Sequence, residues 1–331
     1  MTAIEISELT HVYGRRRGIE GVCLTVEPGQ IFGFLGPNGA GKSTTIRILM
    51  GLLRAASGSA RMLGLDCWRD GVNVRRRTGY VPGDVRLYSW LNLQRGLQIV
   101  GRIHGRDLTR SGMEYAERFR LEPGLPARKM SRGNRQKLAL VLALAANPEL
   151  LILDEPTSGL DPLMQDTLML CLRERAQAGS TVLFSSHTLS EVEAICDRVA
   201  MIRHGQLVEN GAVAELQRNA PRQLRLRLRP GQAVPTEWPS GCTPLVVPGQ
   251  DAAGKLELLV PPGQRDRTCV LQFCGSSAGV LAWAVSRGFE DLEVGPPSLE
   301  TLFRMYYEDD GGGVRQRPEA VSVQPYSGKQ G

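Results

Sequence analysis

GPNGAGKS, residues 36–43, matches the phosphate-binding pattern G-x-x-x-x-G-K-[ST] without a gap. The apolar run QIFGFL at residues 30–35 predicts a buried strand before it, and residues 42–53 predict a helix after it. Glycines let the backbone curl so that successive N–H groups point at phosphate oxygens, and the start of the helix adds the positive end of its dipole. We therefore expect a nucleotide phosphate loop between a strand and a helix.

Each residue of this loop has an expected place in nucleotide binding. Lys42 should reach the β- and γ-phosphates, and Ser43 should be a ligand of Mg²⁺. The other residues expected around the ATP phosphates are Gly36, Pro37, Asn38, Gly39, Ala40, Gly41 and Thr44. The sequence thus predicts that ATP and Mg²⁺ bind here.

Two acids end a second apolar run, LLIL at residues 150–153. Asp154 is placed to hold Mg²⁺, and Glu155 would lie near the γ-phosphate, where it can act as a general base toward the attacking water. Such an acid pair is by itself more often structural than catalytic. The phosphate loop favours the catalytic interpretation, because ligands of open parallel sheets bind at the carboxyl ends of the strands.

His187 follows a third apolar run, TVLF at residues 181–184, on the same side as Asp154. A neutral imidazole there could hold the γ-phosphate and the attacking water in line. We predict that Glu155 and His187 are the catalytic residues.

The stretch MSRGNRQ at residues 130–136 places a hydroxyl residue and a glycine at the start of a helix, which makes a second anion site. It follows a helical region and precedes the acid pair. In this position it resembles the signature of ABC nucleotide-binding domains, usually written LSGGQ. Ser131 and Gly133 match that pattern, Met130 is a mild change, and Arg132 and Asn134 depart from it.

The resemblance covers residues 1–220 and implies an ATPase whose domains meet head to tail. The implied in-trans contacts to the ATP of a second subunit come from Ser131, Arg132, Gly133 and Asn134. In the run DEPTSGLD, residues 154–161, Ser158 and Asp161 fall on the family's D-loop. His187 looks like its switch histidine. Tyr13 sits where the family stacks an aromatic ring on adenine, although half-buried packing is the alternative.

One loop departs from the family in a way that bears on coupling. Many members have a glutamine after a strand like residues 79–82, and it touches Mg²⁺ and the attacking water. This chain has Gly83 followed by Asp84. Gly83 has no side chain for that role, and Asp84 offers a carboxylate one position later.

The pattern of elements predicts an α/β core over residues 1–220 with a helical subdomain at about 84–146, and the resemblance implies that this is a P-loop NTPase core of the ABC ATPase type. Residues 221–310 predict a small α+β accessory domain. Its expected elements are a strand with alternating Leu and Arg at 224–229, strands at 255–260 and 268–273, a helix at 276–287 and a last helix opened by Ser298. The tail at 311–331 has low hydrophobicity and is predicted to be disordered.

Bulk properties exclude several classes of protein. The chain has 331 residues, of which 42% are hydrophobic and 22% charged, which excludes a disordered chain. None of the seven cysteines forms a C-x-x-C pair, so neither a zinc site nor a thioredoxin-like site is indicated. The longest apolar run, residues 138–146, is about half of the ~18–20 residues that span a bilayer. A membrane role would therefore require a partner that supplies the pore, and we expect peripheral attachment to the cytoplasmic face of the cell membrane.

The SRGNRQ form of the signature, the C-terminal domain and the closing run at residues 291–303 resemble the ATP-binding subunits of ABC-2-type exporters. The resemblance implies a separate ABC-2-type permease, a second nucleotide-binding subunit, expected as a homodimer, and export of a drug, antibiotic or lipid-like molecule. No nucleic-acid partner is expected.

Three alternatives remain at this point. A translation-associated ABC protein usually carries two cassettes in one chain, whereas this sequence shows one phosphate loop. A non-transport ABC ATPase of DNA repair would need a long coiled coil between Lys42 and Ser131, and that interval lacks sustained heptads. A basic nucleic-acid-binding module with a nucleotide site would suit the net charge of +6 and predicts strongly salt-dependent binding.

Overall fold

The computed structural model describes residues 2–14, 16–220, 222–246, 267–273 and 277–295. Contacts divide the chain into two compact units, one of Met1–Ala220 with Cys274–Leu281 and one of Pro221–Phe273 with Ala282–Gly331. The strand predicted at 255–260, the helix predicted to open at Ser298 and the tail at 311–331 lie outside the described residues.

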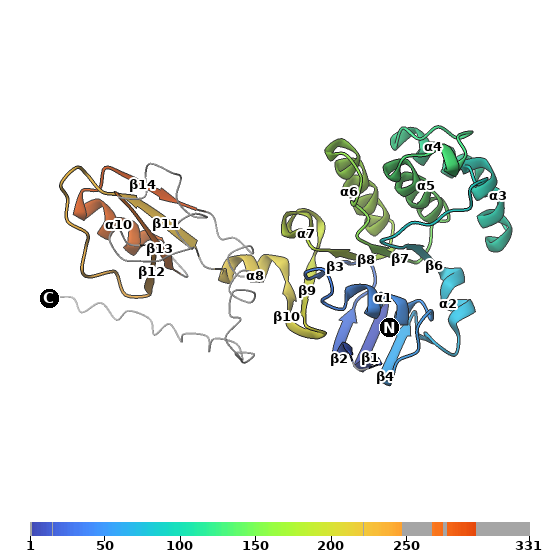
Figure 1. The fold of residues 1–331 in the computed structure, drawn as a ribbon, viewed down its shortest axis with the longest axis horizontal. Helices are drawn as coiled ribbons and strands as arrows, with labels where there is room; N and C mark the ends of the chain where they lie inside the picture. Colours follow the sequence, from blue (N-terminus) through green and yellow to red (C-terminus); the bar gives the residue numbers. More distant parts are fainter. Residues whose placement is uncertain (1, 15, 221, 247–266, 274–276, 296–331) are drawn as a thin grey trace. The chain divides into compact units, whose positions relative to one another are not determined.

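The first unit is built on a central six-stranded sheet with the strand order β10-β9-β3-β8-β7-β6 (Figure 1). Five strands run parallel, and the edge strand β10 pairs antiparallel with β9. All residues of β3, β7 and β8 are buried, as expected for parallel strands covered on both faces. The bounds of the strands are β10 (Gln206–Ala212), β9 (Arg198–Arg203), β3 (Ile31–Leu35), β8 (Thr181–Ser186), β7 (Leu150–Asp154) and β6 (Thr78–Val81).

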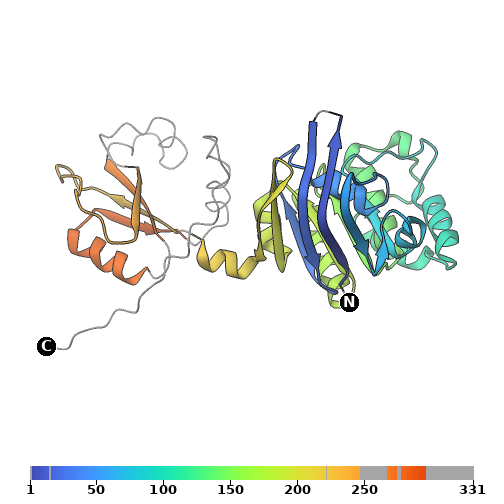
Figure 2. The ribbon, with the colours of Figure 1, turned by 90° about the horizontal axis from the view of Figure 1, so that it is seen from below.

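A second, antiparallel sheet has the order β2-β1-β4-β5 and faces the central one (Figure 2). Its strands are β2 (Arg16–Val26), β1 (Ile4–Tyr13), β4 (Ser57–Met62) and β5 (Leu65–Asp66). Helix α1 (Lys42–Leu49) lies between the two sheets, and one hydrophobic core joins all three layers. That core includes Ile4, Leu24, Phe32, Phe34, Ile46, Leu49 and Ile152. The start of α1 is thereby held firmly at the end of β3.

Helix α1 is shorter than the helix predicted over residues 42–53. It ends at Leu49, with Met50 as its C-terminal cap. Gly51 follows with φ at +63°, the left-handed conformation that commonly ends helices, and a Cβ there would lie 2.5 Å from the carbonyl oxygen of Cys67. The close approach of another segment therefore ends the helix before its sequence pattern does.

The helical subdomain follows β6 and forms a separate group of helices in Figure 1. It contains α3 (Leu93–His104), α4 (Thr109–Arg118), the 3₁₀ turn η1 (Ala127–Lys129) and α5 (Arg132–Ala145). Helices α3 and α4 pack on α5, and α5 also contacts β6. The short α2 (Gly71–Arg77) precedes β6. Helix α5 thus connects the subdomain to the central sheet.

The remaining helices of the first unit are α6 (Pro162–Gln177), α7 (Leu189–Ile195) and α8 (Val213–Asn219). Helices α6 and α7 cover the face of the central sheet opposite α1 (Figure 1). Gly33 of β3 faces α7, where a Cβ would lie 2.8 Å from Val192 Cγ1 and 3.0 Å from Cys196 Sγ. Only a residue without a side chain allows α7 to pack this closely on β3.

The second unit contains an antiparallel sheet of order β12-β13-β11-β14 and the part of helix α10 (Ala278–Arg287) that begins at Ala282. The strands are β11 (Arg222–Arg227), β12 (Cys242–Val246), β13 (Thr268–Phe273) and β14 (Asp291–Val294). Leu224 and Leu226 of β11 are fully buried, and Arg225 and Arg227, which alternate with them, are partly exposed, as the alternating pattern predicts. Within the described ranges, none of the helices combines the length and apolarity that a membrane-spanning segment requires.

The tight fit at Gly33 predicts the outcome of a single methyl addition. Gly33→Ala should lower the free energy of unfolding by about 1–3 kcal/mol, because the methyl would overlap α7 in a closed core. The measurement is the midpoint of thermal or denaturant unfolding. Gly124→Ala is the matched control, because a Cβ there meets nothing within 4 Å. Equal stability of the two variants would contradict the proposed close packing.

Candidate functional site

The loop at residues 36–41 leaves β3 and enters α1 through backbone conformations that favour glycine. Gly39 and Gly41 have φ of +82° and +118°, in the left-handed region that other residues rarely adopt. At Gly36 the constraint is packing, because a Cβ would lie 2.4 Å from the carbonyl oxygen of Ile202 on β9. The loop therefore curls tightly against the sheet edge.

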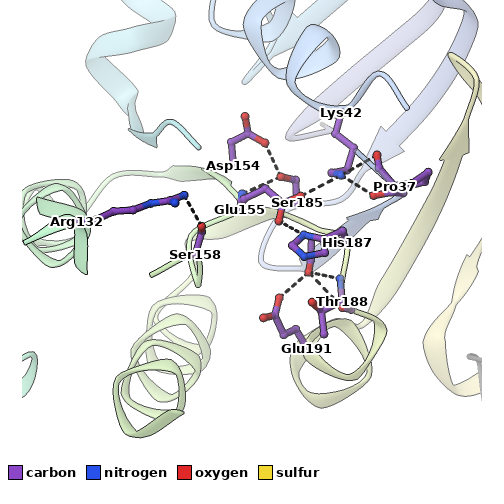
Figure 3. A network of polar contacts seen from close by, with 12 residues as sticks. Pro37, Lys42, Arg132, Asp154, Glu155, Ser158, Ser185, His187, Thr188 and Glu191 are labelled. Atoms are coloured by element: carbon purple, nitrogen blue, oxygen red, sulfur yellow. Dashed lines mark hydrogen bonds and ion pairs between the residues drawn. The ribbon is translucent and has the colours of Figure 1, made fainter. Parts of the chain in front are cut away.

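Lys42 extends back over this loop from the first turn of α1. Its Nζ donates to the carbonyl oxygens of Gly36, at 2.5 Å, and Pro37, at 3.2 Å. The same ammonium lies 3.0 Å from Glu155 Oε1, and the Lys42 side chain is only 5% exposed. A buried positive charge is thus held at the mouth of the phosphate loop by oxygen atoms alone (Figure 3).

The two acids at the end of β7 point to different partners. Asp154 is buried, and its Oδ1 accepts a hydrogen bond from Ser185 Oγ at 2.7 Å. Glu155 leaves the strand with φ at +50°, a left-handed conformation that is uncommon for a residue other than glycine. Its N–H group lies 3.2 Å from the carbonyl oxygen of Ser185 and 3.0 Å from Ser185 Oγ. This sharp turn directs the Glu155 carboxylate toward Lys42, as Figure 3 shows.

His187 completes a three-residue cluster around the Glu155 carboxylate. It directly follows β8, and its Nδ1 lies 2.5 Å from Glu155 Oε2. Glu155 therefore bridges Lys42 through one oxygen and His187 through the other. The imidazole is about half exposed, so one side of the cluster faces solvent.

Ser185 is a site residue that the sequence analysis missed. It is fully buried in β8 and contacts both acids, Asp154 through its hydroxyl hydrogen and Glu155 through its hydroxyl and carbonyl oxygens. The available signal was the pair of serines at residues 185–186, which interrupts the apolar strand directly before His187. A buried hydroxyl in such a strand requires a hydrogen-bond partner, and two acids at the end of the neighbouring strand can supply it.

The donor atoms at this edge suit Mg²⁺. Ser43, half buried in the first turn of α1, and the buried carboxylate of Asp154 offer hard oxygen ligands of the kind that Mg²⁺ prefers. No group of three or more His, Cys, Asp or Glu residues that could hold a metal occurs among the residues placed by the structure. A Mg²⁺ site that is completed by phosphate and water typically has only a small number of protein ligands.

The pKa of Tyr80, on β6, reflects the burial and the charges of the same region. Burial, with a further contribution from the negative charge of Asp154, raises the pKa of its hydroxyl to about 12, against the opposing effect of Arg47. The phenol is therefore neutral at physiological pH, so it adds no negative charge beside Asp154.

Tyr13 and Thr44, which the sequence predicts to lie around the nucleotide, are close together in the structure. Tyr13 ends β1, the residue is 44% exposed, and its hydroxyl is 3.4 Å from Thr44 Oγ1. The His11 ring contacts the Tyr13 ring edge-on at 4.6 Å. An exposed aromatic ring thus stands beside the first turn of α1.

The signature residues form the first turn of α5. Ser131 is the N-terminal cap, and its Oγ accepts from the backbone N–H of Asn134 at 3.2 Å. Arg132 Nη2 donates to Ser158 Oγ at 2.9 Å. A Cβ on Gly133 would lie 2.5 Å from the carbonyl oxygen of Gly159. The signature turn therefore contacts the segment that follows Glu155 in the same subunit.

The loop after β6 and the D-loop are also placed by the structure. Gly83 lies against Asp154, since a Cβ there would be 3.5 Å from Asp154 Oδ2. Asp84 is 75% exposed and forms an ion pair with Arg86 at 2.8 Å. In the D-loop, Asp161 caps α6 by accepting from the N–H of Met164 at 3.0 Å. Gly83 thus lies beside Asp154, whereas the Asp84 carboxylate pairs with Arg86.

Comparison with known proteins supports the ABC resemblance. The ABC transporter family matches residues 19–158. The daunorubicin/doxorubicin resistance ATP-binding protein DrrA of Streptomyces peucetius is 37% identical over 237 residues, which are 70% of this chain and 72% of that protein. The linearmycin resistance ATP-binding protein LnrL of Bacillus subtilis is 31% identical over 219 residues, 64% of this chain and 70% of that protein.

A solved structure of the ATP-binding subunit of an ABC transporter superposes with a TM-score of 0.62 and 30% sequence identity. It covers 66% of this chain, and the match includes 92% of that subunit. The predicted P-loop NTPase core with a helical insertion is confirmed by this likeness. The chain therefore belongs to the ABC transporter family, as an ATP-binding subunit that hydrolyses ATP.

Proposed function

We propose that this chain powers the export of a drug-like or antibiotic molecule through a separate ABC-2-type permease, as one of two paired ATP-binding subunits at the cytoplasmic face of the cell membrane. The support for a drug-like substrate is the pair of relatives named for resistance, to daunorubicin and doxorubicin and to linearmycin. The separate permease accounts for a chain in which no described helix is suited to cross a membrane.

The observation that carries the catalytic part of the proposal is the position of Glu155 between Lys42 and His187. A carboxylate at the end of β7, next to the phosphate loop, is placed to accept a proton from a water that attacks the γ-phosphate. When the triphosphate binds, its oxygens compete for the Lys42 ammonium. Glu155 would then be released from its ion pair, while His187 keeps its other oxygen oriented.

The remaining residues bind and orient the nucleotide. The loop residues 36–41 would supply backbone N–H groups, and the exposed Tyr13, whose hydroxyl lies 3.4 Å from Thr44 Oγ1, would offer a stacking surface for the base. Ser43 and Asp154 would hold Mg²⁺, which neutralises phosphate charge when bound. Ser185 keeps the Asp154 carboxylate and the Glu155 backbone in fixed positions.

The second ATP-binding subunit enters the proposal through the signature turn. The amino end of α5, with its cap Ser131 and the N–H group of Gly133, is suited to phosphate oxygens of a nucleotide held by the partner. ATP would thus join two subunits, and closure of the pair would shift the permease between its access states. Hydrolysis of ATP then removes the contact that holds the two subunits together.

The assignment of Glu155 as the general base predicts the behaviour of Glu155→Gln. ATP hydrolysis should fall by about 10²-fold or more, because a carboxamide cannot accept the proton. ATP should still bind and should convert the variant into a stable dimer. The measurements are ATPase rates and light scattering after gel filtration, each with and without ATP and Mg²⁺.

Glu149→Gln is the matched control for this experiment. Glu149 directly precedes β7 but pairs with Arg77 on the surface, so its variant should hydrolyse ATP like the wild type. Wild-type hydrolysis by Glu155→Gln would show that another group is the base.

The contacts of Ser185 predict a loss of turnover on removal of one hydroxyl. Ser185→Ala should lower kcat about tenfold, equivalent to about 1.4 kcal/mol, because both acids lose a positioning hydrogen bond. Steady-state ATPase kinetics and the unfolding midpoint are the measurements.

Ser180→Ala controls for a general loss of stability. Ser180 is also buried and makes two hydrogen bonds, to Arg175 and Pro148, but it precedes the amino end of β8. Its variant should lose a similar amount of stability and keep its kcat. A common loss of kcat in both variants would argue against a specific role for Ser185.

The export proposal predicts energy-dependent drug efflux. Co-expression of the chain with a candidate ABC-2-type permease in a drug-sensitive bacterium should lower the accumulation of daunorubicin, measured by its fluorescence in the cells. The same permease with Glu155→Gln should leave accumulation at the level of cells without either protein. Equal efflux with the variant would mean that this chain does not power the export.

A further inference from the structure

Arg132 stands where the ABC signature has a glycine, and its side chain makes a contact that a glycine could not make. The guanidinium Nη2 donates to Ser158 Oγ at 2.9 Å, across a separation of 26 residues (Figure 3). The aliphatic part of the side chain lies over Gly159, where an added Cβ would be 3.5 Å from Arg132 Cγ and 3.7 Å from Cδ. Arg132 therefore covers the turn that follows Glu155.

A close backbone contact and a second hydrogen bond also join the start of α5 to the segment 156–159. Gly133 approaches Gly159 so closely that a Cβ on Gly133 would lie 2.5 Å from the Gly159 carbonyl oxygen. One turn further along α5, the buried Gln136 donates through Nε2 to the carbonyl oxygen of Pro156 at 3.0 Å. The first two turns of α5 and the segment 156–159 thus contact each other at three points.

The segment that Arg132 covers is tied directly to Glu155. The N–H of Ser158 donates to the carbonyl oxygen of Glu155 at 3.1 Å, which closes a tight turn. Glu155 is itself held at its N–H by Ser185. A displacement of the signature turn would therefore be transmitted through Ser158 to the residue that contacts Lys42 and His187.

We infer that Arg132 is a positioning residue that acts through Ser158: it holds the signature turn of α5 and the Glu155 turn as one unit, so that the two ATP sites of a dimer respond together. The inference rests on the proposed function, in which the signature turn meets the partner's ATP and Glu155 serves the subunit's own ATP. Without this contact the two turns keep their backbone contacts but lose the side-chain link.

A different role for Arg132 makes the opposite prediction about Ser158. Arg132 is exposed, and its guanidinium could instead bind the phosphates of the partner's ATP directly. In that case Ser158 would be dispensable, and removing its hydroxyl would free the guanidinium for phosphate. The pair of variants Arg132→Ala and Ser158→Ala therefore separates the two roles.

The test measures kcat, KM and the Hill coefficient for ATP in Arg132→Ala, Ser158→Ala and the double variant. We expect each single variant to lower kcat about threefold to tenfold and to lower the Hill coefficient, with a smaller change in KM. The double variant should be no worse than either single one, because both remove the same contact. Arg132→Lys, which keeps a donor, should retain part of the wild-type cooperativity.

Controls separate positioning from loss of fold. Arg110→Ala removes an exposed arginine of α4 that pairs with Glu114, and it should leave kinetics unchanged. Unfolding midpoints of all variants should lie close to the wild type. Loss of activity in Arg132→Ala with wild-type kinetics in Ser158→Ala, or multiplying effects in the double variant, would overturn the inference.

A binding readout distinguishes failure of this inference from failure of the proposed function. In the Glu155→Gln background, Arg132→Ala and Ser158→Ala should each raise the ATP concentration for half-maximal dimer formation, by a similar factor of about threefold to tenfold. If Glu155→Gln alone forms no ATP-dependent dimer, the proposed function is wrong. If it dimerises and neither added substitution shifts the ATP requirement, only the role of Arg132 is wrong.

Discussion

The parallel register of β3, β8 and β7 brings the functional groups of this protein together. Leu35 pairs with Ser186, and Ser185 pairs with Asp154, so the three strands end at one edge of the sheet within a residue of each other. The phosphate loop, His187 and Glu155 each follow one of these strands directly. Because all three strands are buried on both faces, their register cannot slip without moving buried side chains to new neighbours.

The two buried charged side chains at this edge, Lys42 and Asp154, each have polar partners. Lys42, which is almost fully buried, lies among two carbonyl oxygens and the Glu155 carboxylate, and Asp154 accepts from Ser185. The left-handed turn at Glu155 separates its carboxylate from that of the preceding acid and directs it to Lys42 and His187. An uncommon backbone conformation is thus maintained by an ion pair and by hydrogen bonds at the Glu155 N–H.

Helix α5 relates this edge to the surface that would face a second subunit. Its amino end carries the signature turn, its body supports α3 and α4, and its first two turns contact the segment 156–159 through Arg132, Gly133 and Gln136. The helical subdomain and the Glu155 turn therefore share a direct packing contact. Gly83, after the carboxyl end of β6, makes a second contact between the start of the helical subdomain and the site, since its backbone lies against Asp154.

The sequence by itself determined the fold class and the identity of the phosphate loop, because these depend on local patterns. An apolar strand, a glycine-rich loop with Lys42 and an acid pair after a second apolar strand are each readable within about ten residues. The alternating Leu and Arg residues of β11 were equally readable, since a half-buried strand has a period of two. Only the tertiary structure decided that α1 stops at Leu49, that Ser185 serves both acids and that Arg132 reaches Ser158. Each of these depends on contacts between segments 16 or more residues apart, as with Gly51 and Cys67, and the approach of such segments is set by packing of the whole core.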